Sequence, residues 1–371
     1  MNILEEIQNC PVEWKELGEV CSVNKGKQLN KNLLIDDGLY PAYNGGQTYS
    51  GRTNDYNVEA NTIIVSQGGA SAGFVNFVET KFWANAHCYY ILPDETQVKN
   101  RFVYHFLKMN QKYLMDFQHG AGIPALKSDK LTKLLIPVPP IKIQEKIVQI
   151  LDKFTEYVKE LTSELTSELT SRKKQYSYYR DKLLSFEDEV YQVEWKKLGE
   201  VAENLDSKRK PVAKGGRSSG VYPYYGASGI VDYVDDFIFD GDFLLVSEDG
   251  ANLVVRKTPI AFSISGKTWV NNHAHILKFD NMINQKFVNY YLNNIDLSPY
   301  ISGAAQPKLN QQNLNNIKIP YPSLEIQSRI VEVLDKFDTV CNDLNIGLPK
   351  EIELRQKQYE YWRDQLFDFS K

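Results

Sequence analysis

The feature that most constrains this chain is an internal repeat. The stretch from Ile141 to Phe186, IKIQEKIVQILDKFTEYVKELTSELTSELTSRKKQYSYYRDKLLSF, contains neither glycine nor proline, and the segment from Ile326 to Phe369 repeats it 183 positions later without insertion or deletion. Self-similarity at a fixed distance indicates two copies of one structural unit. The 371 residues are therefore expected to form two similar halves.

The first of these stretches is expected to be one long helix. Its apolar residues follow one another in steps of mostly three and four, which is the spacing of one face of an amphipathic helix. These residues are Ile147, Leu151, Phe154, Val158, Leu161, Leu165, Leu169, Tyr176, Tyr179, Leu183 and Phe186. At ~1.5 Å per residue the helix would be roughly 65 Å long. A seam this narrow requires a partner helix, and the C-terminal repeat supplies it.

Both halves share a framework outside the helices. The phrase EWK-x-LGE-V opens the first half at Glu13 and the second at Glu194. A helix is expected from Arg101 to Lys112, before the long stretch begins. It follows short strands that are predicted from β-branched and alternating residues at 60–66, 74–78 and 87–92.

The predicted fold class is therefore α+β, with two similar globular domains separated by long helices that form a coiled coil. The repeat also predicts the domain boundaries. These are 1–140 for the first globular domain, 141–186 for the central helix, 187–322 for the second globular domain and 323–371 for the C-terminal helix.

Charge does not indicate nucleic-acid binding by the chain as a whole. The 43 basic and 47 acidic residues give a formal net charge of −4, so any contact with DNA must be local. The four cysteines lack CxxC spacing and the N-terminus MNILEEIQN is acidic, which indicates a reducing cytoplasm. Apolar runs stay below the ~18 residues that a membrane span requires, so a soluble protein is expected.

One segment matches a catalytic motif. The residues from Gly69 to Gly73 read G-x-S-x-G, the pattern in which serine hydrolases place their nucleophile. That motif requires a helix directly after Ser71, whereas the residues from Phe74 onward read as a strand, and the second copy has Asn252 and no serine. A hairpin turn of small residues is the better interpretation.

Two histidines suggest a metal site. His273 and His275 could chelate an ion, but the sequence offers no third ligand at a metal-binding spacing. We therefore expect packed strand histidines, no metal and no cofactor. The sequence also lacks the P-loop, zinc-protease and methyltransferase tetrapeptide motifs, so no catalytic residue is predicted.

Basic and polar residues gather in the stretches that differ between the halves. Lysine and arginine can hold phosphates, while amide side chains can read base edges. The candidate DNA-binding residues are Lys25, Lys27, Gln28, Lys31, Asn44, Gln47, Gln67 and Lys127 in the first half, and Lys208, Arg209, Lys210, Arg217 and Lys308 in the second. The alternative is a solvated loop and, for Lys127 and Lys308, a helix cap.

Taken together, these motifs are specific enough to identify a family. The chain has two variable domains. Each is opened by EWK-x-LGE-V and is closed by IP-x-P, Q, I-V-x-x-LDKF and then RxKQYxYxRD. This pattern resembles the specificity (S) subunits of type I restriction-modification enzymes. The resemblance spans the whole chain. The TSELTSEL run is similar to the four-residue repeats in the central helix of one branch of that family.

The resemblance implies two target-recognition domains that each read one half of a bipartite site in double-stranded DNA. Two antiparallel helices would hold them apart and dock two methyltransferase (M) subunits and, through these, restriction (R) subunits. The S subunit itself would have no catalytic residues. The candidate M-binding residues recur in register between the halves, and they are Phe154, Arg180, Asp181, Phe337, Arg363 and Asp364.

Two other functions fit parts of the sequence. A structural coiled-coil adaptor that joins two copies of some protein would share the duplicated helices, but it would have no sequence-selective affinity for DNA. A hydrolase would use Ser71, and an esterase assay on a Ser71→Ala variant would test it.

The TSEL repeat finally predicts that the length of the central helix sets the spacing between the two half-sites. Leu161, Leu165 and Leu169 step by four, which is the signature of a four-residue insertion in a coiled coil. Each unit adds ~6 Å and turns the helix by about 40°. A base pair of DNA advances ~3.4 Å and turns roughly 35°. The number of units is therefore expected to set the spacer between the half-sites, and the alternative is that the repeat is plain helix.

Overall fold

The computed structural model describes residues 3–117, 124–186, 193–303 and 306–369. The chain divides into two compact units, one of Met1–Leu165 with Glu351–Lys371 and the other of Thr166–Lys350. The end of the C-terminal repeat therefore belongs to the unit that begins the chain. The predicted start of the second domain, residue 187, lies outside the described residues.

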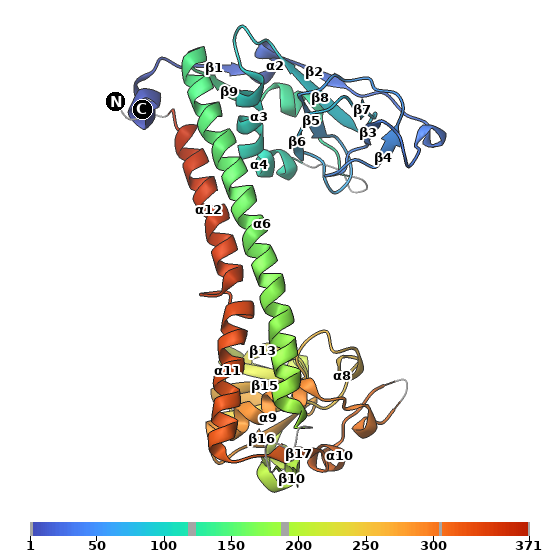
Figure 1. Ribbon diagram of the computed structural model, residues 1–371, viewed down its shortest axis with the longest axis vertical. Coiled ribbons are helices and arrows are strands. Elements are labelled where there is room, and N and C mark those ends of the chain that lie inside the picture. Colours follow the sequence, from blue (N-terminus) through green and yellow to red (C-terminus); the bar gives the residue numbers. More distant parts are fainter. Residues whose placement is uncertain (1–2, 118–123, 187–192, 304–305, 370–371) are drawn as a thin grey trace. The chain divides into compact units, whose positions relative to one another are not determined.

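Helix α6, Ile141–Ser185, confirms the predicted long helix (green in Figure 1). Its 45 residues follow the two prolines that end the preceding strand. Buried Gln144 fixes this start, because its Oε1 accepts from Lys99 N at 2.8 Å while its Nε2 donates to the carbonyl of Pro139 at 2.8 Å. The side chain thus joins the helix to the domain before it.

The C-terminal repeat consists of two helices, so the expectation of a single helix over 323–371 is wrong. Helix α11 spans Leu324–Asn342 and α12 spans Leu348–Leu366 (Figure 1). Gly347 and Pro349 explain the interruption. A Cβ on Gly347 would lie 2.5 Å from the carbonyl oxygen of Thr339, and Pro349 cannot donate a backbone hydrogen bond, so it is tolerated only in the first turn of a helix.

The phrase EWK-x-LGE-V forms the same motif in both units. In the first unit, strand β1 (Glu13–Glu16) pairs antiparallel with β9 (Leu135–Val138) and leads into the short helix α2 (Leu17–Val20). The matching elements of the second unit are β10 (Glu194–Lys197), β17 (Lys318–Tyr321) and α7 (Leu198–Val201). The strand that closes each domain is therefore hydrogen-bonded to the strand that opens it.

Two small sheets form the rest of the first domain, with strand orders β2-β8-β5-β6 and β4-β3-β7. The strands are β2 (Cys21–Lys25), β3 (Tyr40–Tyr43), β4 (Gly51–Thr53), β5 (Thr62–Ser66), β6 (Val75–Val78), β7 (Trp83–Ala84) and β8 (Cys88–Pro93). The three strands predicted for this domain are confirmed as β5, β6 and β8.

The second domain has one six-stranded sheet with the order β11-β16-β14-β15-β12-β13. The strands are β11 (Glu203–Asn204), β12 (Ser219–Gly226), β13 (Gly229–Val234), β14 (Phe239–Ser247), β15 (Ala261–Val270) and β16 (Ala274–Lys278). Strand β15 pairs antiparallel with β14 and, through its last residues, parallel with β12. It takes the places of both β6 and β7, so one sheet replaces two.

The remaining described helices are shorter. They are α1 (Ile3–Asn9), α3 (Asn100–Met109), α4 (Gln111–Asp116), α5 (Ser128–Thr132), α8 (Asn252–Val255), α9 (Met282–Asn294) and α10 (Gln311–Asn315), with 3-10 turns at Lys31–Leu33, Asp206–Lys208, Lys214–Gly216 and Ser298–Tyr300. The helix predicted from Arg101 to Lys112 is divided at Asn110, whose Nδ2 donates to the carbonyl of Phe106 at 2.9 Å. None of the described helices is long and apolar enough to cross a membrane.

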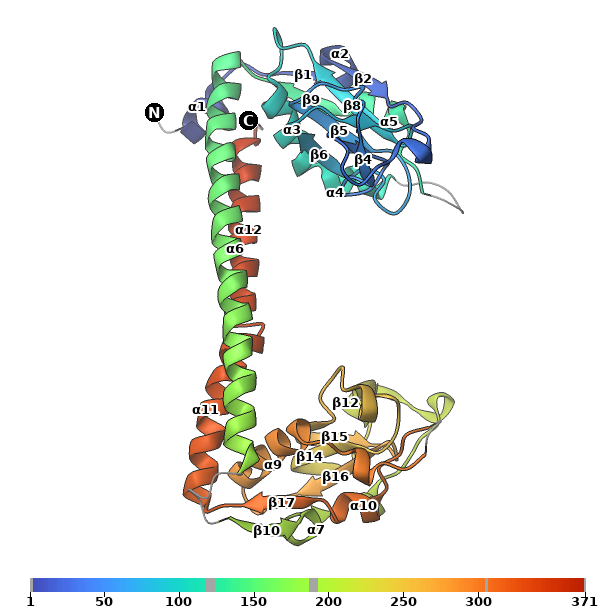
Figure 2. The same ribbon diagram turned by 45° about the vertical axis from the view of Figure 1, so that its right-hand side comes forward.

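Each unit has a core in which one helix of the domain packs against both long helical segments. In the first unit, Phe102 of α3 shares a core with Leu151 of α6 and lies 5.2 Å from the ring of Phe367, which follows α12. In the second unit, Phe287 of α9 shares a core with Leu334 of α11 and with the end of α6. Figure 2 shows α9 between the second sheet and these helices.

A carboxylate on the long helix bonds to the domain helix in both units. Asp152 of α6 accepts from Arg101 and, at 2.6 Å, from His105 Nε2. In the second unit the residue at the same repeat position, Asp335 of α11, accepts from the Lys286 ammonium at 2.6 Å and from the Tyr290 hydroxyl at 2.7 Å. Burial would raise the pKa of Asp152, but the bonds from its two partners lower it to about 2.

We predict that Asp152→Asn destabilises the first unit by about 1 kcal/mol at neutral pH, because it removes a charged acceptor whose side chain is 39% exposed. That corresponds to a fall of roughly 2–4 °C in the midpoint of thermal unfolding. The pKa of Asp152 is lower in the folded protein, so its stabilisation is complete above about pH 4 and disappears toward pH 2.

The difference between the native protein and Asp152→Asn should therefore shrink as the pH falls from 5 to 2. Glu168→Gln, which breaks an exposed pair with Arg172 on the same helix, is the matched control and should change stability by less than ~0.5 kcal/mol. A pH-independent difference for Asp152→Asn would contradict the assignment.

Candidate functional site

In each unit, a tryptophan of the framework donates a hydrogen bond to the backbone of the variable basic loop. Trp83 Nε1 donates to the carbonyl of Lys27 at 2.8 Å, and Trp269 Nε1 donates to the carbonyl of Lys210 at 2.6 Å. Both tryptophans lie where β7 and β15 pair in parallel with β3 and β12. Residues 25–31 and 208–217 are therefore held at the same place on the framework, although their sequences differ.

These tryptophans were missed as functional residues in the sequence. The signal was present, because the two halves share the phrases WANAH and WVNNH. Taken alone, the shared phrases indicate only that this part of the framework is common to both halves. The side chain that matters bonds to a loop far away in the sequence, and its importance becomes visible only in the fold.

Most candidate DNA-binding residues of the first unit are exposed. They are Lys25, Lys27, Gln28, Lys31, Asn44, Gln47 and Lys127, while Gln67 is half-buried. Backbone bonds bring their loops together, since Leu126 N donates to the carbonyl of Gln67 at 2.7 Å and Ser66 Oγ donates to that of Gly46 at 3.0 Å. Residues 44–47, 66–69 and 124–127 thus form one surface, and its contact with DNA stays a prediction.

In the second unit, the candidates divide into two groups. Lys208, Lys210 and Lys308 are exposed, whereas the two arginines are bound internally. Arg217 Nη1 donates to Asp232 at 3.0 Å, and its guanidinium lies 4.2 Å from the centre of the Tyr224 ring. The arginine side chains are therefore suited to shaping the loop, whereas Lys208 and Lys210 are the exposed groups that can face a partner.

Arg209 was expected to contact phosphate, but its side chain is only 11% exposed and belongs to a charged cluster. Its Nη1 donates to Glu248 at 2.7 Å, and its Nη2 lies 3.3 Å from Asp206. Lys308 lies 3.2 Å from the other oxygen of Glu248. Burial would raise the pKa of Asp206, but the bond from His275 and the charges of His275 and Arg209 lower it.

His275 completes this cluster. Its Nδ1 lies 2.5 Å from Asp206 Oδ2 and its Nε2 lies 2.6 Å from the carbonyl of Leu309. Both neighbours are hydrogen-bond acceptors, so the imidazole ring links the Asp206 carboxylate to the carbonyl of Leu309. In the first unit a tyrosine, Tyr89, takes this position and donates its hydroxyl to the carbonyl of Leu126 at 3.3 Å.

The cluster contains the third ligand that sequence spacing did not reveal. Atoms of Asp206, Glu248 and His275 that could bind a metal lie within 4.8 Å of one another. The carboxylates of Asp206 and Glu248 are already paired with Arg209 and Lys308, which leaves little negative charge for a cation. The other candidate metal ligand, His273, lies 2.8 Å from Asp249 outside this set.

The G-x-S-x-G segment forms the hairpin turn that was predicted. Ala72 N donates to the carbonyl of Gly69 at 3.0 Å, and Phe74 N donates to that of Ser71 at 2.9 Å. Strand β6 follows directly. Ser71 therefore lacks the helix that a hydrolase nucleophile requires after it.

The Arg–Asp pairs at the ends of the two repeats have the same geometry. Arg180 Nη2 donates to Asp181 at 2.7 Å, and Arg363 Nη2 donates to Asp364 at 2.8 Å. Each guanidinium also lies near the ring of a tyrosine one turn earlier, at 5.8 Å in the second unit and 5.9 Å in the first. The carboxylates are exposed, so each pair presents a fixed acceptor at the helix surface.

An exposed aromatic pair lies beside each Arg–Asp pair, and sequence analysis did not single it out. The rings of Tyr178 and Tyr179 lie 5.3 Å apart at 75°, and those of Tyr361 and Trp362 have the same separation and angle. Tyr178 and Tyr361 are the more exposed member of each pair. Tyrosine, tryptophan and arginine are enriched among the residues that contribute most to binding at protein interfaces.

The two phenylalanines predicted to bind M are less accessible. Phe337 stacks on Tyr176 and Tyr179 at 6.0 and 5.7 Å, within the contact between α6 and α11. Phe154 is half-buried at the equivalent position of α6. The structure therefore gives Phe337 a role in holding the helices together.

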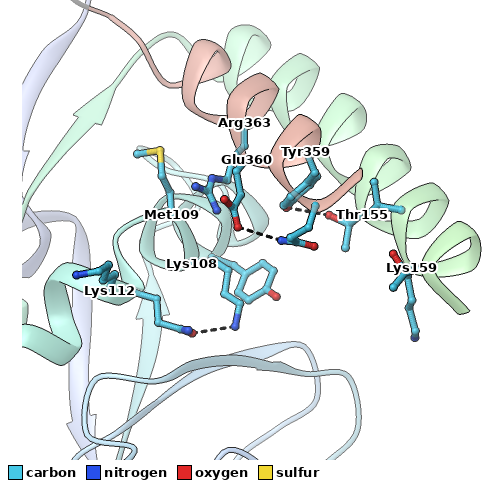
Figure 3. A pocket seen from close by; sticks show the side chains of 13 residues that line it. Lys108, Met109, Lys112, Thr155, Lys159, Tyr359, Glu360 and Arg363 are labelled. Carbon is cyan, nitrogen blue, oxygen red and sulfur yellow. Dashed lines mark hydrogen bonds between the residues drawn. The ribbon is translucent and has the colours of Figure 1, made fainter. Parts of the chain in front are cut away.

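A groove of about 720 Å³ separates the domain helices from the long helices in the first unit (Figure 3). The groove is lined by one acidic residue, Glu360, and by four basic residues, Lys108, Lys112, Lys159 and Arg363. Figure 3 also shows the bond between Thr155 and Tyr359 at its floor.

The second unit has a groove of about 550 Å³ at the same repeat positions, and Arg180 and Tyr176 line it. Both grooves are basic, in a chain whose net charge is −4.

Comparison with protein families identifies the repeat. Residues 11–171 and 192–354 each match the type I restriction modification DNA specificity domain. The chain is 32% identical to the specificity subunit of the Escherichia coli type I restriction enzyme EcoR124I/EcoR124II, in an alignment that covers 100% of this chain and 98% of that protein. It is also 34% identical to a putative specificity subunit of Mycoplasma pneumoniae over 64% of this chain and 98% of that protein.

Solved structures show the same fold. A type I restriction-modification specificity subunit from Mycoplasma genitalium is similar with a TM-score of 0.57 at 23% identity, over 98% of both chains. A chain from a structural study of complex assembly and conformational transition in a type I restriction-modification system has a TM-score of 0.67 at 15% identity. That match covers 97% of this chain and 98% of the other.

We predict that Trp269→Phe loosens the loop at 208–217, because it keeps the ring but removes the bond to the carbonyl of Lys210. A net loss of ~1 kcal/mol makes local opening about fivefold more frequent. Native-state trypsin cleavage after Lys208 or Lys214 should accelerate by about that factor. Trp83→Phe is the matched control and should accelerate cleavage only at Lys25–Lys31, so equal acceleration at both loops would contradict the anchoring role.

Proposed function

This chain belongs to the family of type I restriction-modification DNA specificity subunits, and we propose that it selects the DNA sequence on which such an enzyme acts. Each unit contains one recognition domain, and each domain reads one half of a bipartite site in double-stranded DNA. The observation that carries this proposal is the duplicated tryptophan anchor, through which Trp83 and Trp269 hold loops of different sequence at one place on a common framework.

A rigid framework with variable loops is what sequence reading requires. Affinity for DNA comes mostly from phosphate contacts, whereas specificity comes from base edges, so the loops must be held in register with the duplex. The exposed lysines Lys25, Lys27, Lys208 and Lys210 would contact phosphates. Amide side chains such as Gln28 would read base edges in the major groove.

The recognition surfaces of the two units should differ in chemistry. Arg209 and Arg217 would act as positioning residues in the second unit, since both are bound to carboxylates of their own domain. The first unit has no arginine at the matching loop positions, where its exposed candidates are Lys25, Lys27, Gln28 and Lys31. Two unlike surfaces of this kind are suited to two unlike half-sites.

In this proposal the chain carries no catalytic residue, and methyl transfer and DNA cleavage belong to the M and R subunits. Two M subunits dock in equivalent ways, one at Arg180–Asp181 and the other at Arg363–Asp364, and the R subunits bind through M. Support comes from the equal geometry of the two pairs and from the exposed aromatic residues beside them. The complex would act in the cytoplasm, where its DNA lies.

The TSEL repeat would set the spacer between the half-sites. The repeat lies inside the unbroken helix α6, so each unit changes the helix length by ~6 Å and its rotation by about 40°. We therefore expect a change of about one base pair per unit, since a base pair turns the duplex by roughly 35°.

We expect each domain to determine one half of the methylated site. Replacing residues 20–120 by the equivalent stretch of another specificity subunit, and co-expressing the M subunit, should change one half of the motif found by methylome sequencing. The matched exchange in the second domain should change only the other half. A motif in which both halves change would contradict the modular assignment, and unselective or absent methylation would favour a structural adaptor.

Native mass spectrometry should show two M subunits for each chain. The double variant Arg363→Ala/Asp364→Ala should bind one M subunit, and so should Arg180→Ala/Asp181→Ala, because each removes one docking surface. Arg172→Ala/Glu168→Ala, an exposed pair in the repeat, is the control and should still bind two. A one-to-one complex of the native chain at excess M would refute equivalent docking.

A further inference from the structure

We propose that the break between α11 and α12 is a joint that follows changes in the length of α6, so that α6 alone determines the DNA spacer. We call residues 343–347 the linker. The proposal rests on the proposed function, because it concerns how the TSEL repeat could set the spacer. It assigns to the linker a part in specificity that neither the family nor the sequence indicates.

The linker lies opposite the repeat in the second unit. Tyr176 of α6 stacks on Phe337 of α11 at 6.0 Å. One turn earlier on α6, Arg172 and Lys173 lie near enough to Cys341 for their charges to counteract the rise in its pKa that burial causes. The helices are therefore antiparallel, and each turn back along α6 corresponds to a turn forward along α11.

The next turn of α6 is 166–169, one TSEL unit, and the next residues of the facing segment are 344–347. Thus the uninterrupted repeat on one side faces the interruption on the other.

Specific bonds build the interruption. Asp343 N donates to the carbonyl of Thr339 at 3.2 Å and ends α11, while Asp343 Oδ1 accepts from Asn345 N at 2.6 Å. Gly347 then packs against the last carbonyls of α11, where a Cβ would lie 2.5–2.6 Å from two oxygens. The side chains between them, Leu344 and Ile346, are 72% and 76% exposed. They are therefore free to move without disturbing a core.

A continuous helix opposite the repeat would oppose any change in repeat number. Adding one unit to α6 moves the contacts beyond it by ~6 Å and about 40°, while a facing helix of fixed length keeps its own contacts at a fixed separation. Five linker residues span up to ~17 Å when extended, against about 7 Å as helix.

The linker can therefore extend for an added unit and loop out for a deleted one. Helices α11 and α12 would keep their contacts with α6, at Tyr176–Phe337 and at Thr155–Tyr359.

The first test changes the linker and leaves α6 unchanged. Four Gly and Ser residues inserted after Ile346 should leave the methylated motif and its spacer as they are, because the linker follows α6 and does not set the distance. A changed spacer, or methylation lowered more than tenfold, would overturn the proposal. This variant lengthens an exposed loop, so it should fold, and thermal unfolding checks that it does.

The second test changes α6 with and without the joint. With the native linker, deleting Thr166–Leu169 should shorten the spacer by one base pair, and duplicating these residues should lengthen it by one. The variant Asp343→Ala/Gly347→Ala/Pro349→Ala removes the signals that interrupt the helix. It should retain the native motif with native α6, and lose at least tenfold in methylation when α6 is lengthened or shortened.

The control for the second test is Leu344→Ser/Ile346→Ser, which keeps the joint and should tolerate both changes of α6. Equal methylation with and without the joint would overturn the inference and leave the proposed function intact. If the triple variant does not fold with native α6, the linker insertion alone decides. A different outcome would be an unchanged spacer when Thr166–Leu169 are deleted and the linker is native. That result would show that the repeat does not set the spacer, and it would refute this part of the proposed function.

Discussion

The attachment of each recognition domain to its long helix depends on one carboxylate. Asp152 and Asp335 stand at the same position of the repeated LDKF phrase, and each accepts hydrogen bonds from two residues of the facing domain helix. The apolar core beneath them provides most of the attraction, but hydrophobic contact has no preferred direction. Hydrogen bonds are directional, so the carboxylate fixes how the domain helix is turned on the long helix.

The positions of the loops follow from this attachment. Gln144 and Gln327, also equivalent in the repeat, are buried at the start of α6 and α11, where they bond to the carbonyls of the prolines that end each domain. Strand, helix and loop are thus connected by polar contacts of the same kind in both units. The recognition loops can vary because none of their residues takes part in these bonds between domain and long helix.

Several features could be predicted from the sequence, because each depends on local pattern. The seam of apolar residues predicted α6, and β-branched runs predicted β5, β6 and β8. The interruption at 343–347 was missed because the repeat favoured a continuous helix, while the local effects of Gly347 and Pro349 proved stronger. The internal bonds of Arg209 could not be predicted for another reason, since its partner Glu248 is distant in the sequence and only folding brings the two together.

One backbone carbonyl oxygen of the framework accepts its hydrogen bond from a different type of side chain in each unit. The carbonyl of Leu126 accepts from the hydroxyl of Tyr89, whereas that of Leu309 accepts from the imidazole of His275. The framework therefore requires a donor at this point and not a particular residue. This explains how the halves have diverged in sequence while their loops remain attached at the same places.

The membership of residues 351–371 in the first unit has a consequence for synthesis on the ribosome. The ring of Phe367 lies 5.2 Å from that of Phe102 and 5.7 Å from that of Phe106, so the core of the first unit includes a side chain that is synthesised after the whole second unit. Domains usually fold as they emerge, from the N-terminus onward. Here the first domain must wait with part of its apolar surface exposed, and the second unit can complete its core before the first.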